Sequence, residues 1–441
     1  MRVKGPVGGM SRRRFLGGTA LALGGLALGG CSGTALGGNP RVHFWNLFGG
    51  GDGARLAQMQ DQFAGRYPNI DLEATTLLWG SPYYTKLAMA ATGGRPPEVA
   101  VLHLTRLPAY APAGLLEPLD PGMLSDYDVG PENFLPTVLD SAKYEGEIFA
   151  IPLDTHPFVM YYNTDICKKA GLLDGDGNLK PFSGPDETIK VMKTAKEATG
   201  EYGLSFYPVD DAGCWRLFNT LYTQLGGEAV LSPDAKEVTM NMDLAEQAVD
   251  FMIELGDGTG VAPTDLDYPG AVAAFAGGQA GFFWNGEWEV TTFQDAGMPF
   301  SMVPFPNIFG SNAAHADRHS FVIPKGIARD PKRMDAAMSF VSSMLKSSFI
   351  WAEGGHIPAY LPIEESEKYK KLTPQSNYAG VADDVALDPP AWFSGSGSGL
   401  EIEASAAFQL AMGGSLSAKA AVSQFKAALE EFVKKPAPVP A

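Results

Sequence analysis

Residues 42–75 read VHFWNLFGGGDGARLAQMQDQFAGRYPNIDLEAT, and this stretch indicates the fold class. A short apolar run at 42–46 is followed by Asp52, which can cap a helix. Apolar residues then recur at helical spacing until Pro68 ends the helix, and 70–75 alternate as a strand does. Strand, helix and strand in this order predict a parallel α/β unit with a right-handed crossover.

The same alternation continues along the chain. A second helix is expected from Tyr83 to the glycines at 93–94, followed by a strand at 99–104. The pattern restarts after apolar runs at 149–153 and 158–162, and later helices are expected at 185–199, 244–255, 334–345 and 422–433. Two successive α/β units without a linker predict two lobes with a cleft between them.

The composition of the chain argues against some classes of function. The chain has 441 residues, of which 45% are hydrophobic, so it can bury more than one core. Its formal net charge is −17, and without residues 1–30 it carries 28 basic and 50 acidic residues, about −22. A chain this acidic is poorly suited to bind nucleic-acid phosphates or an anionic lipid surface.

The first thirty residues have the pattern of an export signal. Residues 11–16 read SRRRFL, and a run without charge follows to Gly30. The run is too short and too rich in glycine for a membrane span. The arginine pair followed by Phe-Leu resembles a twin-arginine signal. Residues 28–31 resemble a lipobox, which predicts a signal at 1–30, lipidation of Cys31 and a flexible tether at 31–40.

Two further cysteines, Cys167 and Cys214, remain if Cys31 is lipidated. Their spacing leaves two alternatives open, a disulfide and two separate buried thiols. Neither a CxxC pair nor a Cys/His zinc spacing occurs, so the sequence predicts no metal site and no cofactor.

Catalytic signatures are missing from the sequence. It contains no GxSxG elbow, no P-loop and no GxGxxG after a strand. The glycines at 49–53 indicate a tight turn into a helix, and residues 174–178 start like a calcium loop but lack its turn glycine and bidentate glutamate. Glu287 and Glu289 are too close in sequence to flank a sugar from opposite faces.

Aromatic and polar residues instead gather at predicted strand ends and turns. A pyranose ring stacks on a flat aromatic side chain, and its hydroxyls need paired donors and acceptors. In open α/β sheets, ligands bind at the carboxyl ends of the strands. Candidates of this kind are Trp45, Asn46, Trp79, His103, Asp154, His156, Trp284 and Glu287, whereas Trp351, His43 and His315 are expected to be structural.

Several motifs, in order and spacing, resemble a known family over almost the whole chain. Beside the lipobox at Cys31, they are the segments 94–99 (GRPPEV), 146–152 (GEIFAIP), 160–165 (MYYNTD), 275–281 (FAGGQAG) and 284–286 (WNG). The chain resembles the extracellular solute-binding proteins of ABC importers, family 1, the maltose-binding-protein-like class.

The resemblance implies a two-lobed α/β fold of the type II periplasmic-binding-protein kind. Each lobe would hold a mainly parallel sheet flanked by helices, and the chain would cross between lobes near 151–155, 304–318 and 355–365. The implied division is 41–152 with 313–360 for lobe 1, 153–312 with 361–433 for lobe 2, and a disordered tail at 434–441.

The resemblance also implies which residues face the ligand. By position within the family's motifs they are Trp45, Asn46, Trp79, His103, Asp154, His156, Trp215, Trp284, Glu287, His319, His356 and Trp392. His156 stands where maltose-binding protein places a carboxylate, and His319 where many relatives have small residues. These two differences imply a site of its own character.

The implied function is a monomeric substrate-binding lipoprotein outside the cytoplasm, anchored to the membrane through Cys31. It would capture a mono- or oligosaccharide by hinge closure, without catalysis, and deliver it to the membrane subunits of an ABC permease. Three alternatives stay open: a secreted glycoside hydrolase using Glu287 and a distant carboxylate, a peptide receptor, and a metal or metal-chelate receptor built from His103, His156, His319 and His356.

Overall fold

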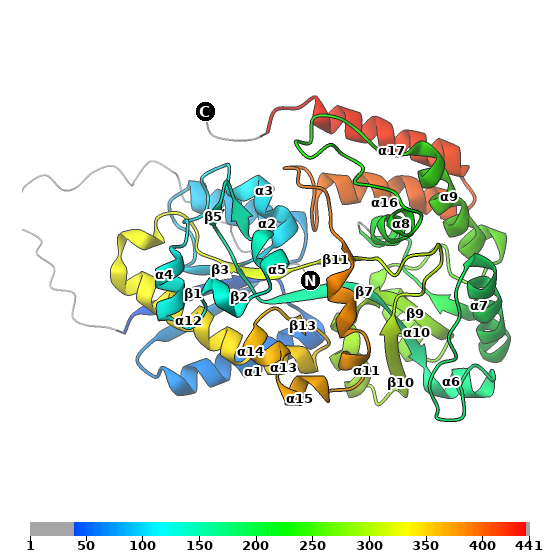
Figure 1. Cartoon of the computed structure of the whole chain (residues 1–441), viewed down its shortest axis with the longest axis horizontal. Helices are drawn as coiled ribbons and strands as arrows, with labels where there is room; N and C mark the ends of the chain where they lie inside the picture. The colour runs from blue at the N-terminus through cyan, green and yellow to red at the C-terminus, as the bar shows by residue number, and fades with distance from the viewer. Residues whose placement is uncertain (1–38, 211, 438–441) are drawn as a thin grey trace, which may run out of the picture. The chain divides into compact units, whose positions relative to one another are not determined.

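The computed structural model describes residues 39–210 and 212–437. The predicted signal at 1–30, the predicted lipidation site Cys31, residues 31–38 of the predicted tether and residues 438–441 of the predicted tail lie outside the described residues. The described part folds around two hydrophobic cores, one for each lobe (Figure 1). The two-lobed α/β fold expected from the sequence is therefore confirmed.

The first lobe is built on a five-stranded sheet in the order β2-β1-β3-β12-β6. Its central strand β1 runs parallel to β2 and β3, whereas β12 runs antiparallel to β3 and β6. The strands are β1 (Arg41–Asn46), β2 (Asp71–Thr76), β3 (Val99–His103), β6 (Ile151–Pro152) and β12 (His319–Val322), and the main helices are α1 (Gly50–Arg66), α2 (Ser81–Thr92), α12 (Pro331–Lys346) and α13 (Ser348–Glu353).

The second lobe is built on a mixed sheet in the order β14-β11-β7-β9-β8, and β10 and β13 also pair with β7. β7 is antiparallel to β9, β10, β11 and β13, so the expectation of a mainly parallel sheet does not describe this lobe. The strands are β7 (Asp154–Asn163), β8 (Tyr202–Ser205), β9 (Ala280–Gly286), β10 (Phe300–Pro304), β11 (Ala314–Asp317), β13 (Ile357–Pro358) and β14 (Val385–Ala386). β7 brings the chain in from the first lobe and β11 returns it, which makes their directions opposite.

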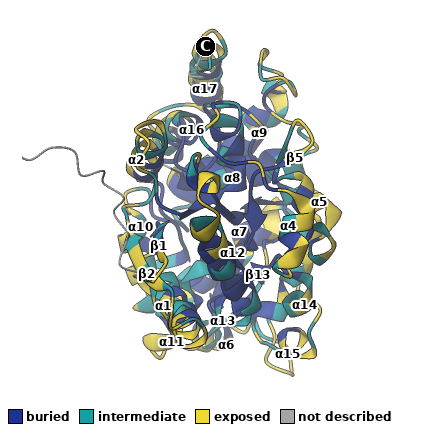
Figure 2. Cartoon of the chain, turned by 90° about the vertical axis from the view of Figure 1, so that its left-hand side faces the viewer, coloured by how far each residue is buried: buried dark blue, intermediate teal, exposed yellow. Residues whose placement is uncertain are grey.

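Helices cover the second sheet, and their inner faces build the larger core. Phe218, Phe408 and Phe425 pack against one another there, one pair stacked and two edge-to-face, with ring centroids 4.4 to 6.1 Å apart. Figure 2 shows α8 (Gly213–Gln224) of this lobe as almost wholly buried, whereas outer helices such as α4 (Pro121–Asp126) of the first lobe are exposed. The main helices of this lobe are α6 (Thr164–Lys169), α7 (Pro185–Thr199), α8 (Gly213–Gln224), α9 (Met242–Ile253), α10 (Tyr268–Ala276), α11 (Val290–Asp295), α16 (Gly399–Met412) and α17 (Ala418–Val433), and the small helices α3 (Leu107–Tyr110), α4 (Pro121–Asp126) and α5 (Pro136–Asp140) belong to the first.

Capping residues explain where three of the predicted helices begin or end. α7 matches its predicted bounds because Gly200, with φ at 80°, ends it in the left-handed conformation. α9 starts two residues earlier than expected, since the side chain of Asn241 accepts the backbone N–H of Asp243 and Leu244. α12 starts at Pro331, because Asp330 caps it and proline suits a first helical position.

The two cysteines of the described chain are separate buried thiols. Cys167 lies on α6 and Cys214 on α8, and neither forms a disulfide. Burial raises the pKa of Cys167 to about 12, and burial together with Asp210 raises the pKa of Cys214 above its usual range. Both side chains therefore act as small apolar residues.

Over the described residues, no helix combines the length and the apolar character that a bilayer crossing requires.

The aromatic centre of the first core offers a test of the fold. Phe340 on α12 is fully buried and contacts Phe44 and Phe63, with ring centroids 4.8 and 5.1 Å away. Phe340→Ala should lower the free energy of unfolding by about 3–5 kcal/mol, because it leaves a cavity in the core. Leu78→Ala, at a side chain that is 76% exposed, should change it by less than about 0.5 kcal/mol. Urea denaturation measures both, and equal effects would contradict this packing.

Candidate functional site

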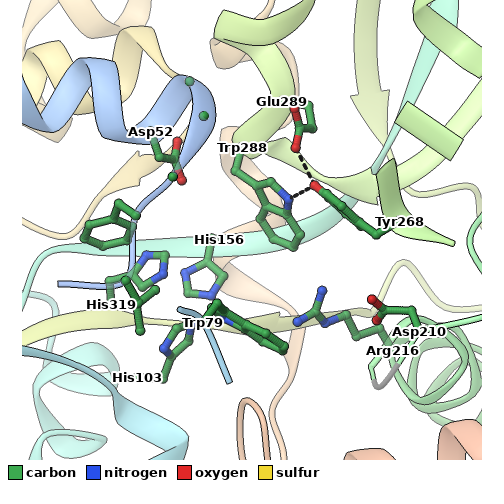
Figure 3. A pocket seen from close by; sticks show the side chains of 15 residues that line it. Asp52, Trp79, His103, His156, Asp210, Arg216, Tyr268, Trp288, Glu289 and His319 are labelled. Carbon is green, nitrogen blue, oxygen red and sulfur yellow. Dashed lines mark hydrogen bonds between the residues drawn. The ribbon is translucent and has the colours of Figure 1, made fainter. Parts of the chain in front are cut away.

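A cavity of about 410 Å³ lies between the two lobes (Figure 3). Both lobes contribute to its wall, and its residues come from strand ends, helix starts and the turns between them. They are Leu47, Phe48, Gly49, Gly50, Gly51, Asp52, Trp79, His103, His156, Asp210, Arg216, Tyr268, Trp288, Glu289 and His319.

The first lobe contributes the carboxyl edge of its sheet. His103 ends β3, and His319 begins the antiparallel β12 directly opposite it. The glycine-rich turn 47–52 connects β1 to the start of α1 at the same edge, and Trp79 precedes α2. This is the edge at which open α/β sheets generally bind ligands.

The second lobe contributes an aromatic and acidic wall. Trp288 and Glu289 belong to the short helix η4 (Glu287–Glu289) that follows β9, and Tyr268 begins α10. The indole Nε1–H of Trp288 donates to the Tyr268 hydroxyl at 2.6 Å, and that hydroxyl donates to the Glu289 carboxylate. This chain of hydrogen bonds holds the Trp288 ring in place against the cavity.

Arg216 of α8 lies between the two tryptophans of the cavity. Its guanidinium carbon is 5.6 Å from the ring centre of Trp79 and 5.3 Å from that of Trp288. Burial by itself would lower the pKa of Arg216, but Tyr207 and Glu401 outweigh it and raise the pKa. The guanidinium therefore stays charged, and cation–π attraction links it to an indole from each lobe.

A buried carboxylate organises the floor of the cavity. Asp154 has no exposed surface, and its Oδ1 accepts the backbone N–H of His319 at 2.9 Å and lies 2.9 Å from Nδ1 of His156. Its Oδ2 lies 2.8 Å from Nδ1 of His319 and accepts the indole N–H of Trp351 at 2.6 Å. Both oxygens of the carboxylate are thus surrounded by nitrogen donors.

The ionisation of the floor follows from these contacts. Burial alone would raise the pKa of Asp154, but His319, His356 and His156 outweigh it and hold the pKa well below its usual value. Burial and the neighbouring His319 lower the pKa of His156 to about 3, so its ring is neutral. Because its Nδ1 proton is donated to Asp154, Nε2 of His156 is left as a hydrogen-bond acceptor.

His356 lies behind the floor and joins the lobes. Its Nε2 is 3.0 Å from Asp52 of α1, and its Nδ1 is 3.1 Å from both Asp154 and Glu287. Burial would lower the pKa of His356, but Asp52 and Asp154 raise it well above the usual value. Burial also raises the pKa of Glu287 to about 7.

The two lobes are in direct contact on both sides of the cavity. On one side Arg55 of α1 donates to Thr291 of α11 at 3.1 Å. On the other side Ser81 of α2 donates to the carbonyl of Gly397 at 2.9 Å, and Arg106 donates to the carbonyl of Ser394 at 3.0 Å. The structure therefore shows the lobes closed over the cavity.

Of the residues predicted to face a ligand, some are at the cavity and others are not. Trp79, His103, His156 and His319 line it, and Asp154, Glu287 and His356 form the buried layer behind it. The remaining five do not line the cavity: Trp45, Asn46, Trp215, Trp284 and Trp392.

The alternation of side chains along a strand explains why Trp45 does not line the cavity. Val42 and Phe44 point into the core, so Trp45 faces the other side of β1, where it lies beneath Lys86 of α2. The Asn46 side chain accepts the N–H of Phe48 and shapes the turn. Trp284 is inside β9 and packs on Phe305.

The other two tryptophans are held by helices of the second lobe. Trp215 is fully buried and donates its indole N–H to Asp388 at 2.6 Å. Trp392 packs on Phe393 and Phe432. Both side chains belong to the packing of α8, α16 and α17 rather than to the cavity wall.

Sequence reasoning missed the turn residues 47–51 and six further residues of the cavity wall: Asp52, Asp210, Arg216, Tyr268, Trp288 and Glu289. Two of them lie close in the sequence to a residue that was predicted to face the ligand. Trp288 stands in the same motif as Trp284, four residues later, and Arg216 follows Trp215 on a helix, where one residue turns the side chain by about 100°.

The contact between the closed lobes leads to a first prediction for this site. A Cβ added at Gly51 would lie 2.8 Å from Cβ of Thr291, whereas a Cβ at Gly65 of the same helix meets nothing within 4 Å. Gly51→Ala should push the lobes apart and increase the radius of gyration in small-angle X-ray scattering. Gly65→Ala should not, and Thr291→Gly should restore closure in the Gly51→Ala background. An unchanged scattering curve for Gly51→Ala would contradict the contact.

A second prediction concerns acid stability. Burial, together with Arg216 and His156, lowers the pKa of His315 well below its usual value. The unfolded chain binds a proton at this side chain below about pH 6.5 and the folded chain does not, so stability falls as the pH drops. His315→Gln should reduce this slope by up to about 1.4 kcal/mol per pH unit below pH 6.5. Urea denaturation at several pH values measures the slope, and a slope equal to that of the wild type would disprove the assignment.

Comparisons with known proteins place the chain in a family. The family model described as bacterial extracellular solute-binding protein matches residues 58–373. A maltotriose-binding protein of Pyrococcus abyssi is 25% identical over 223 residues, which is 50% of this chain and 44% of that protein. A putative binding protein of Brucella abortus is 24% identical over 140 residues, 32% of this chain and 33% of its own. The chain thus matches less than half the length of these curated relatives.

Solved structures agree on the fold. The GacH receptor of Streptomyces glaucescens, determined unliganded and with acarbose, has a TM-score of 0.75 at 19% identity, over 90% of this chain and 99% of that one. The MalE domain of Bdellovibrio bacteriovorus bound to maltotriose has a TM-score of 0.72 at 20% identity, over 90% and 100%. With the family model matching most of its length, the chain belongs to the bacterial extracellular solute-binding proteins.

Proposed function

We propose that this protein captures a carbohydrate between its lobes and delivers it to the membrane subunits of an ABC importer. The observation that carries the proposal is the pair of indoles, Trp79 from the first lobe and Trp288 from the second, on one cavity. Flat aromatic faces bind the apolar face of a pyranose ring. The names of similar proteins, which mention maltotriose and acarbose, support this class of ligand.

The polar groups of the cavity suit sugar hydroxyls. His156 offers an acceptor nitrogen, Arg216 offers donors, and Asp52, Asp210 and Glu289 offer carboxylate oxygens. Such a set pairs with the donor and acceptor of each hydroxyl group. The proposed ligand-binding residues are therefore Asp52, Trp79, His103, His156, Asp210, Arg216, Tyr268, Trp288, Glu289 and His319.

Transport follows from closure in this proposal. A ligand that contacts both lobes stabilises the closed state by its differential affinity for it. The contacts of Arg55 with Thr291 and of Ser81 with Gly397 form only when the lobes meet. A permease that binds the closed surface would then recognise the loaded protein.

Export and anchoring complete the proposal. The pattern at 1–30 and the lipobox at Cys31 support a protein that is exported, lipidated at Cys31 and held at the outer face of the membrane as a monomer. The lobe ranges 41–152 with 313–360 and 153–312 with 361–433 are part of the same proposal, except that β11 (Ala314–Asp317) and β13 (Ile357–Pro358) pair with β7 of the second sheet.

Capture without catalysis is favoured over glycoside hydrolysis. Glu287, the suggested catalytic carboxylate, is fully buried behind His356 and does not line the cavity. A general acid must reach the glycosidic oxygen, and this side chain has no surface from which to do so.

Two half-buried tryptophans of the first lobe, Trp79 at the cavity and Trp45 outside it, allow a matched test of sugar binding. Tryptophan fluorescence and thermal unfolding are followed while the protein is titrated with mono- and oligosaccharides. We expect at least one sugar to shift both signals in the wild type. Trp79→Ala should weaken its binding by about tenfold or more, since a lost stacking contact costs about 1.4 kcal/mol.

The control is Trp45→Ala, which removes a half-buried indole of the same lobe at a groove away from the cavity. Its sugar affinity should equal that of the wild type. If no sugar in the panel shifts either signal, or if both variants lose affinity equally, the carbohydrate proposal fails.

A further inference from the structure

We propose that Asp154, His156, His319 and His356 bind a divalent transition-metal ion such as Zn²⁺ beneath the cavity. Each of the four offers one nitrogen or oxygen, and these four atoms lie within 4.8 Å of one another. All four residues are buried. Three imidazoles with one carboxylate make a ligand set typical of zinc and of similar ions.

The distances fit a shared ion. The oxygens of Asp154 are 2.9 Å from Nδ1 of His156, 2.8 Å from Nδ1 of His319 and 3.1 Å from Nδ1 of His356. Two ligands on one tetrahedral zinc ion, at about 2.0–2.1 Å from the metal, are about 3.3 Å apart. Around such an ion these oxygen–nitrogen pairs would separate by a few tenths of an ångström, and the four ligand atoms as a set lie within 4.8 Å of one another.

A second, independent observation comes from unsatisfied polar atoms beside the cluster. Among the described residues, Nδ1 of His356 has no aligned hydrogen-bond partner, although Asp154 and Glu287 are each 3.1 Å away. Both carboxylate oxygens of the fully buried Glu287 also lack one. Buried orphan groups of this kind call for an ion or a water, and a cation next to Glu287 would compensate its charge.

The surroundings hold the ligands as the outer shell of a metal site does. Nε2 of His356 is 3.0 Å from the Asp52 carboxylate, which leaves its Nδ1 facing the cluster. Trp351 stacks on His356, with ring centroids 4.2 Å apart, and donates to Asp154. Carboxylate-to-histidine contacts fix the tautomer of metal-binding imidazoles in this way.

The position of the cluster suggests what an ion would do. Asp154 and His156 belong to β7, His319 to β12, and His356 directly precedes β13, so the four ligands come from the three segments that connect the lobes. An ion would cross-link these segments below the cavity, and it should raise the thermal stability of the protein.

The test uses the untagged full-length protein, freed of metal with a chelator and titrated with Zn²⁺ or Co²⁺ alone. We expect one ion per chain by elemental analysis, a higher melting temperature, and a visible Co²⁺ spectrum with nitrogen ligands. His156→Gln and His319→Gln should each weaken binding by about 100-fold. His315→Gln, a matched buried control outside the cluster, should bind like the wild type.

Three results would overturn the proposal. The first is a wild-type protein that binds neither ion, and the second is a His315→Gln variant that loses as much affinity as His319→Gln. A third is loss of binding in His103→Gln but not in His356→Gln, which would move the ion to the neighbouring group of His103, His156 and Asp317. Far-ultraviolet circular dichroism shows which variants fold, and any that fail are replaced by the others. Because no sugar is used, failure here leaves the carbohydrate proposal standing.

Discussion

The carboxylate of Asp154 connects the parts of the chain that form the site. It receives nitrogen donors from β7 at Oδ1 and from β12 and α13 at Oδ2, and Nδ1 of His356 lies 3.1 Å from Oδ2. Such a group is expensive to bury unless every lone pair is used, because water would otherwise solvate it far better. The cost of leaving any of these partners unpaired therefore keeps the crossing segments in one arrangement and positions the histidines at the cavity floor.

Two kinds of interaction define the cavity above that floor. Aromatic rings approach from opposite lobes with Arg216 between them, and hydrogen bonds at both rims bring the backbones together. Small residues make the close approach possible. A Cβ added at Gly397 would lie only 2.6 Å from the Cα atom of Gly80. The shape of the cavity is thus a property of the interface between lobes rather than of either lobe alone.

Much of the secondary structure was predictable from local patterns. α1, α7 and α12 follow the apolar spacing and end signals that the sequence contains, and β1 and β3 match the predicted apolar runs to within one residue. The direction of β7 was not predictable, because an isolated apolar strand carries no record of the partners on either side. The same limit applies to the thiols Cys167 and Cys214, whose separation depends on how α6 and α8 pack.

The sequence by itself determined the order of strands and helices, the export pattern and the edge of the first sheet where polar residues gather, because these depend on neighbours within a few positions. Only the tertiary structure decided which indole reaches the cavity. A shift of one residue along a helix turns a side chain to another face, which places Arg216 at the cavity and its neighbour Trp215 in the core. It also decided the partners of Asp154, since His319 and Trp351 are 165 and 197 residues away along the chain.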